Sequence, residues 1–281
     1  LKVEVFNCCF NQDSTMFFTD STSNYGSGWV NRTINVRGDL YVDTDFNITN
    51  TLLNLDSTAH IYILPNHTLT ISSSTLQACK STWYGIILTD QTSKIILSDS
   101  SVIKDADNGI EAINDAQVEL NDSYFYYNNR GVYLHDGIFS NFIVNGCAFS
   151  GAANLYPGYG ISLENVSGVN VGSSTLSLNT FSNMNAGIYS LRSNLTVQNC
   201  IFNGIVKPCT PQSLDCYNGQ GSGILAQGDP GNIYQLNVGG GGSEKCYFND
   251  CTNGIYFKTN IQLNAIGNEF NNIGYMNQNT S

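Results

Sequence analysis

The chain has 281 residues, of which 41% are hydrophobic and only 12% are charged, and its formal net charge is −11 at pH 7. With only 11 lysines and arginines it offers no basic face for nucleic acid or for an anionic membrane. Disorder is excluded because it combines low hydrophobicity with high net charge. No apolar run approaches the ~18–20 residues that span a bilayer. Small neutral or cationic partners, including sugars, remain compatible with this composition.

The N-terminal third shows alternation without a clear repeat. Residues 1–30 are irregular and are predicted to form an N-terminal cap or the end of a preceding segment. From residue 31 onward, stretches such as "INVRGDLYV" and "HIYILPNHTLTI" alternate polar and apolar side chains. We expect residues 31–281 to form one continuous repeat domain that begins with these stretches.

A glycine followed by an apolar residue then recurs along the chain. It occurs at Gly85, Gly109, Gly131, Gly160, Gly187, Gly223 and Gly254. The gaps are 24, 22, 29, 27, 36 and 31 residues. A period near the shortest of these gaps, interrupted by insertions, is typical of a repeat architecture.

Each unit contains three short runs in which apolar and polar residues alternate. Such alternation is typical of β-strands, because strand side chains point alternately to the two faces of a sheet. The first run follows the glycine, the second is typified by Val169 and Val171, and the third centres on a phenylalanine. These phenylalanines are Phe125, Phe149, Phe181, Phe202, Phe248 and Phe270. The pattern predicts an all-β fold, a single-stranded right-handed parallel β-helix with three short strands per coil. A β-propeller needs about 40–45 residues per blade and a leucine-rich repeat needs a leucine frame, so neither fits.

The end of the chain falls within a coil. Asn272 to Tyr275 lie where the next strand should begin, and the sequence ends soon afterwards. Because an open parallel edge pairs readily with other chains and repeat arrays carry terminal caps, we expect the polypeptide to continue beyond Ser281.

The passage from Asn35 to Ala112 also resembles a known family. Leu69, Ile71, Cys79, Trp83 and Gly85 stand where secreted right-handed parallel β-helix proteins of Bacteroidota, with a pectin-lyase-like fold, carry a "tLtI…aC…W.GI" passage. The resemblance covers roughly residues 30 to 275. It implies a secreted or cell-surface protein, exported by the type 9 route and therefore a partner of that secretion machinery.

Enzymes of this fold suggest where to look for chemistry. Pectate lyases hold calcium with Asp and Glu clusters and use a basic residue to abstract a proton, and related hydrolases use paired carboxylates. The best catalytic constellation is His135 and Asp136 with Arg130 and Glu164. The alternative is that a turn beside a strand is simply polar, and the polygalacturonase motifs are missing as a set. We therefore expect no enzyme, no metal site and no cofactor, with calcium as the one alternative.

Outward-facing tyrosines are the candidate ligand-binding residues. Tyr133, Tyr189 and Tyr256 occupy the second position after the repeated glycine. Tyrosine stacks on sugar rings, but it is also common on the exposed surface of any strand. The sequence thus favours a structural or adhesion protein with a possible polysaccharide or cell-surface glycan as partner. The alternative is a polysaccharide lyase or glycoside hydrolase of the same fold.

The nine cysteines suggest an oxidising compartment. Cys209 and Cys216 bracket a short loop in the longest insertion, and we expect them to form a disulfide. Cys200 and Cys246 fall at equivalent places in adjacent coils and are expected to be free and buried.

Overall fold

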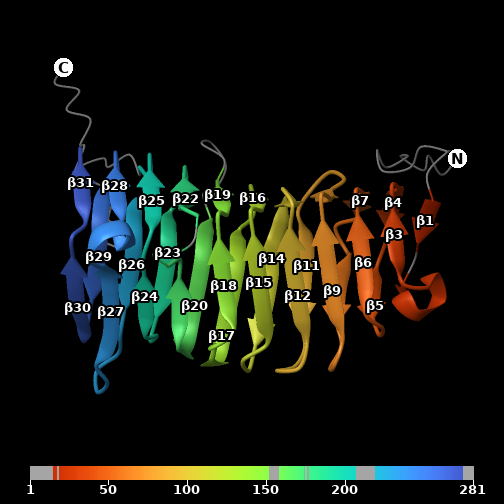
Figure 1. Cartoon of the computed structure of the whole chain (residues 1–281), viewed down its shortest axis with the longest axis horizontal. Helices are drawn as coiled ribbons and strands as arrows, with labels where there is room; N and C mark the ends of the chain where they lie inside the picture. Colours follow the sequence, from red (N-terminus) through yellow and green to blue (C-terminus); the bar gives the residue numbers. More distant parts are fainter. Residues whose placement is uncertain are drawn as a thin grey trace, which may run out of the picture.

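The computed structural model describes residues 15–17, 19–151, 158–173, 175, 177–206 and 219–274. The described strands coil into an elongated stack whose axis runs horizontally in Figure 1. Every third strand joins the same sheet, and every pairing between neighbours is parallel, as between β14 (Ala106–Ile113) and β17 (Arg130–Ile138). The predicted right-handed parallel β-helix with three strands per coil is therefore confirmed.

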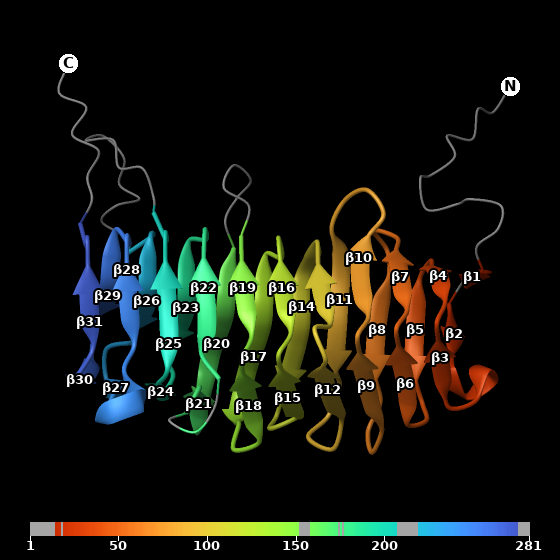
Figure 2. The same cartoon turned by 45° about the horizontal axis from the view of Figure 1, so that its top comes forward.

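Three sides of the stack are formed by parallel sheets (Figures 1 and 2). The first side is an eleven-stranded sheet of β1 (Thr15–Phe17), β4 (Thr33–Val36), β7 (Leu52–Leu55), β10 (Thr75–Ala78), β13 (Val102–Lys104), β16 (Tyr124–Tyr126), β19 (Ala148–Ser150), β22 (Asn179–Ser182), β25 (Cys200–Asn203), β28 (Tyr247–Asn249) and β31 (Glu269–Asn271). The second side is a ten-stranded sheet of β2 (Asp20–Ser21), β5 (Asp39–Val42), β8 (His60–Ile63), β11 (Trp83–Leu88), β14, β17, β20 (Tyr159–Ser167), β23 (Ala186–Leu191), β26 (Ser222–Gln227) and β29 (Asn253–Lys258).

The third side is divided into two sheets. A six-stranded sheet contains β3 (Gly28–Val30), β6 (Phe46–Thr49), β9 (Thr68–Ser72), β12 (Lys94–Ser98), β15 (Gln117–Asn121) and β18 (Phe142–Asn145). A four-stranded sheet contains β21 (Val169–Val171), β24 (Leu195–Val197), β27 (Tyr234–Gly239) and β30 (Ile261–Ile266). Among the described residues, two short 3₁₀ helices, η1 (Thr22–Tyr25) and η3 (Gly242–Glu244), lie between strands at the corners.

The coil structure begins before residue 31. Strands β1, β2 and β3 already pair in parallel with β4, β5 and β6. The described part of the segment that we assigned to a cap or to a preceding segment thus forms a coil of the stack.

A column of stacked phenylalanines runs through the core from β16 to β31. Successive ring centroids are 4.8–4.9 Å apart and the rings are nearly parallel. The five rings from Phe125 to Phe248 are at most 2% exposed, whereas Phe270 in the last described coil is 50% exposed. The coil spacing of a parallel sheet equals the spacing of the rings, so each coil adds one ring to the column.

The repeated glycine lies beside this column. A Cβ atom on Gly187 would lie 2.5 Å from Cδ1 of Phe202 and 2.8 Å from the carbonyl oxygen of Gly223. Gly131, Gly160 and Gly223 have the same surroundings in their own coils. The glycine recurs because the core phenylalanine and the next coil leave no room for a side chain.

Buried polar side chains bridge neighbouring coils. Asn179 accepts a hydrogen bond from the backbone N–H of Cys147 at 2.9 Å and donates one to the carbonyl oxygen of Val144 at 3.0 Å. Ser74 accepts a bond from the N–H of Thr51 at 3.0 Å. These hydrogen bonds satisfy backbone groups at corners where the strand ladders are interrupted. This role accounts for some of the asparagine and serine residues in the chain.

The predicted state of Cys200 and Cys246 is confirmed, since both are free and buried. Cys79 is disulfide-bonded. The disulfide predicted between Cys209 and Cys216 lies outside the described residues. In the described part of the chain, no helix has the length and apolar character needed to cross a membrane.

Candidate functional site

The four residues singled out as catalytic candidates lie together on the outward face of the ten-stranded sheet. Arg130, His135 and Asp136 belong to β17, and Glu164 belongs to β20. His135 and Glu164 are paired in register. Stacking of consecutive coils therefore brings these side chains onto one surface.

His135 lies between two carboxylates. Its Nε2 atom is 3.3 Å from Oε1 of Glu111 and its Nδ1 atom is 3.0 Å from Oδ2 of Asp136. Both ring nitrogens donate together only when the imidazole is doubly protonated. The bond from His135, followed by one from Asn165, holds the pKa of the Asp136 carboxyl below its usual value. The histidine ring also stacks on Tyr133, with centroids 4.7 Å apart.

Glu164 accepts hydrogen bonds at both carboxylate oxygens. The guanidinium of Arg192 donates to Oε1 at 2.8 Å, and the hydroxyl of Tyr133 donates to Oε2 at 2.9 Å. The guanidinium carbon of Arg130 lies 4.3 Å from the centre of the Tyr133 ring, within the range of a cation–π interaction. Two arginines, a tyrosine and a glutamate therefore form one connected polar surface.

The backbone of Arg192 has a left-handed conformation, with φ of 51°. The corner residues of the two preceding coils, Asp136 and Asn165, have the same conformation with φ of 55°. Aspartate and asparagine tolerate it, whereas a long side chain such as arginine seldom adopts it. A residue held in an unfavourable conformation suggests a functional constraint. Arg192 was not among the four catalytic candidates, and the sequence gave no sign of this conformation.

Tyr189 lies on the same surface, stacked on Tyr159 with ring centroids 4.9 Å apart. Tyr159 was missed by the sequence analysis because it precedes the repeated glycine and follows an insertion. Tyr256 lies two strands beyond Tyr189, with Leu225 in register between them. A Cβ atom on Gly219 would be 2.5 Å from both Leu225 and Tyr256, so the chain at Gly219 lies over this part of the sheet. Tyr133 and Tyr189 are likewise two strands apart, with Ser162 in register between them, whereas Tyr256 lies next to the chain at Gly219.

A second aromatic group occupies the N-terminal end of the same sheet face. Tyr41 stacks on Tyr62 at 5.3 Å, and His60 stacks on Tyr84 at 4.1 Å. Nδ1 of His60 is 2.8 Å from the carboxylate of Asp39. These rings precede the regular glycine repeat, which is why the sequence pattern did not point to them.

The hydrogen bonding of the surface indicates what it can do. Glu111, Asp136 and Glu164 are already held by neighbouring donors, and this arrangement fixes polar groups for recognition more readily than it frees a carboxylate for attack. The pectate lyases of this fold raised calcium as an alternative. Among the described residues, no group of three or more His, Cys, Asp or Glu side chains is placed to hold a metal ion.

The Tyr133 hydroxyl gives the surface a signature at alkaline pH. Burial and the hydrogen bond to Glu164 raise its pKa from 10.0 to about 12. Because the pKa of Tyr133 is higher in the folded state than in the unfolded chain, its protonated hydroxyl stabilises the fold. This stabilisation is complete below the unfolded-state pKa and is lost as the pH rises toward the folded-state pKa. We expect the melting temperature to fall less steeply between pH 10 and about 12 in Tyr133→Phe than in the wild type.

Identical slopes for Tyr133→Phe and the wild type would contradict the hydrogen bond between Tyr133 and Glu164.

Comparison with known proteins agrees with the fold. Searches of curated proteins and of solved structures gave no match. The family model described as "Right handed beta helix region" matches residues 59–238, which is more than half of the chain. The matched range includes His60, Tyr62 and Tyr84 of the N-terminal aromatic group and the surface around Glu164. The chain belongs to the family of right-handed β-helix proteins.

Proposed function

We propose that this protein is a β-helical adhesion or structural protein that binds a polysaccharide on the outward face of its ten-stranded sheet. The observation that carries the proposal is the surface around Glu164, where Tyr133 and Arg192 share one carboxylate. Tyr189 lies beside it with its ring stacked on Tyr159. Fixed carboxylates, guanidinium groups and aromatic rings are the groups with which proteins bind sugar hydroxyls and the apolar faces of sugar rings.

The geometry of the stack suits a long polymer. Successive coils repeat about every 4.8 Å, so a linear chain lying along the axis meets aromatic and polar groups at regular intervals. The second aromatic group, at Tyr41, Tyr62 and Tyr84, lies along the same sheet face. Two aromatic groups on one rigid face favour binding of an extended glycan, because simultaneous contacts increase overall affinity.

The proposal includes an extracellular setting. The resemblance to Bacteroidota β-helix proteins implies export by the type 9 route, with release from the cell or display on its surface. A rigid stack of coils is well suited to hold a binding face away from the cell.

A glycan array followed by calorimetry tests the binding proposal. We expect the wild type to bind at least one polysaccharide and Tyr189→Ala to lower its affinity about tenfold, the loss that corresponds to one aromatic contact of about 1.4 kcal/mol. The matched control is Tyr124→Ala, which removes a partly exposed tyrosine from the eleven-stranded sheet. It should retain wild-type affinity. No binding on the array, or an equal loss in both variants, would refute the proposal.

The alternative function is a polysaccharide lyase or glycoside hydrolase. The position of His135 between Glu111 and Asp136 favours it, because a histidine held by carboxylates can transfer protons. Release of new chain ends from pectin, alginate and other acidic glycans tests this activity. Turnover that disappears in both His135→Ala and Arg130→Ala would establish the enzyme and displace the structural interpretation.

A further inference from the structure

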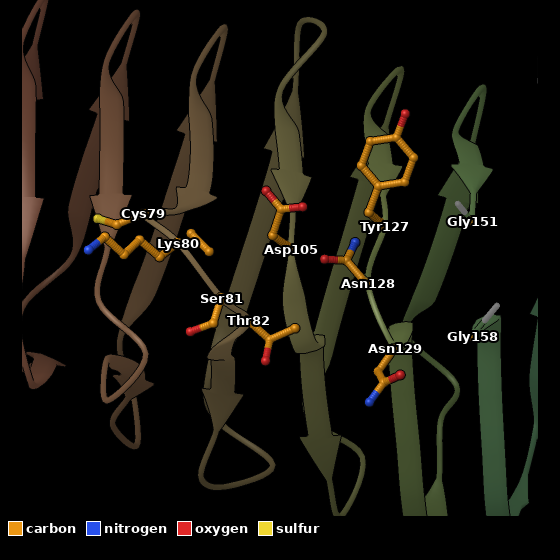
Figure 3. A pocket seen from close by; sticks show the side chains of 11 residues that line it. Cys79, Lys80, Ser81, Thr82, Asp105, Tyr127, Asn128, Asn129, Gly151 and Gly158 are labelled. Carbon is orange, nitrogen blue, oxygen red and sulfur yellow. The ribbon is translucent and has the colours of Figure 1, made fainter. Parts of the chain in front are cut away.

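A separate cavity lies at the corner between the eleven-stranded and ten-stranded sheets (Figure 3). Its volume of about 530 Å³ is within the range of small-molecule sites, roughly 300–1,000 Å³. Residues 78–82 line one side, Gly151 and Gly158 line the other, and Asp105 and Tyr127 to Asn129 lie between them. None of these residues belongs to the surface around Glu164.

In six described coils, the residue directly after the strand of the eleven-stranded sheet has a left-handed backbone conformation, with φ between 51° and 62°. These residues are Asp105, Tyr127, Asn183, Gly204, Asp250 and Asn272. All of them except Tyr127 are glycine or carry a short polar side chain. Aspartate, asparagine and glycine are the residues that tolerate this conformation. A bulky residue there is a true outlier, so Tyr127 opposes the local preference of the fold.

Packing does not account for the tyrosine. The residue is 54% exposed, and its ring is tilted against that of Tyr126 at a centroid distance of 6.3 Å. An exposed aromatic side chain on an unfavourable backbone contributes little to the core. Strain of this kind concentrates at sites where a ligand needs the side chain.

The other walls of the cavity supply polar groups of both kinds. Lys80 offers an ammonium donor, Asp105 offers a carboxylate acceptor, and Ser81 and Thr82 offer hydroxyls. Burial raises the pKa of the Asp105 carboxyl, which indicates that this group is partly withdrawn from water. Asn128 has another role, since its amide bonds the N–H of Ala106 at 2.8 Å and the carbonyl oxygen of Ile103 at 3.0 Å.

We propose that this cavity binds one pyranose unit of a neutral sugar. Tyr127 is the aromatic platform for the C–H face of the ring, and Asp105 and Thr82 exchange hydrogen bonds with its hydroxyls. A carboxylate and a neutral hydroxyl group in the same cavity as an exposed ring suit a neutral ligand that both donates and accepts. The site is independent of the polysaccharide surface on the ten-stranded sheet.

The probes are the methyl glycosides of glucose, galactose, mannose and N-acetylglucosamine, titrated by NMR into the whole chain. We expect at least one of them to bind, and Tyr127→Asn to weaken that binding about tenfold. The same substitution should raise the melting temperature by about 2–4 °C, because asparagine relieves the backbone strain. Asp105→Asn keeps a residue that accepts the backbone conformation and should also weaken binding about tenfold.

Two controls separate the site from a general effect. Asn183→Tyr places a tyrosine at the equivalent corner of another coil, where it should lower the melting temperature and leave sugar affinity unchanged. Tyr189→Ala, which weakens the polysaccharide surface, should also leave it unchanged. Failure of all four glycosides to bind would overturn the proposal, as would undiminished binding by Tyr127→Asn. A melting temperature that does not rise in Tyr127→Asn would overturn the argument from strain.

Discussion

Replacement of Phe181 or Phe202 by alanine is expected to lower the free energy of unfolding by ~3–5 kcal/mol, the usual cost of truncating a fully buried phenylalanine. Both side chains are 0% exposed and their ring centroids are 4.9 Å apart. Each ring is covered on both faces by other rings of the column, so truncation leaves a cavity that neighbouring coils, held by their own ladders, cannot close. Urea denaturation of the purified variants measures the loss.

Phe270 provides the matched control, because it stacks on Phe248 in the same column but is 50% exposed. Phe270→Ala should cost roughly half as much or less, since the removed surface is already partly in water. Tyr189→Ser, on the outward face, should also cost far less than either core change. Equal losses at core and outward positions would refute the assignment of the faces.

The fold could be predicted because every coil repeats the same constraint. The glycine at residue 187 and the phenylalanine at residue 202 recur at equivalent places in successive units. Each recurrence indicates again which side chains of the coil point into the core. A single amphipathic strand would have been ambiguous. The last phenylalanine of the series, Phe270, is the one whose exposure differs, because no described coil covers its outer side.

The candidate site was predictable only in part. Position after the repeated glycine gave the outward direction of Tyr133 and Tyr189, and the sequence analysis also grouped His135 with Glu164. The contact between His135 and Glu111 is diagonal, because Glu111 is paired in register with Tyr133, and spacing alone does not reveal in which direction a side chain leans.

The repeat pattern of the sequence could not predict the backbone conformation of individual residues. Tyr127 reads as an ordinary tyrosine at a strand end, and only its φ of 58° separates it from Tyr126. The left-handed residue is the one that directly follows a strand of the eleven-stranded sheet, and the sequence does not show at which residue that strand ends.

Gly187→Ala is expected to destabilise the protein by about 1–3 kcal/mol or more, although it adds only one methyl group. The new Cβ atom would lie 2.5 Å from Cδ1 of Phe202 and 2.8 Å from the carbonyl oxygen of Gly223. The phenylalanine cannot turn aside, because it is stacked between Phe181 and Phe248. The carbonyl cannot retreat without loosening the pairing of β23 with β26. Thermal and urea denaturation measure the effect.

The control separates crowding from the loss of glycine as such. Gly241→Ala adds the same methyl group where no atom lies within 4 Å and where φ is −80°, which alanine adopts freely. That substitution should change the free energy of unfolding by no more than about 0.5 kcal/mol. Gly187 likewise does not have a positive φ, so a large loss there must come from contact with the phenylalanine column and the next coil. If both substitutions were equally mild, the recurring glycine would need a different cause, and the sequence repeat would no longer report the packing of the core.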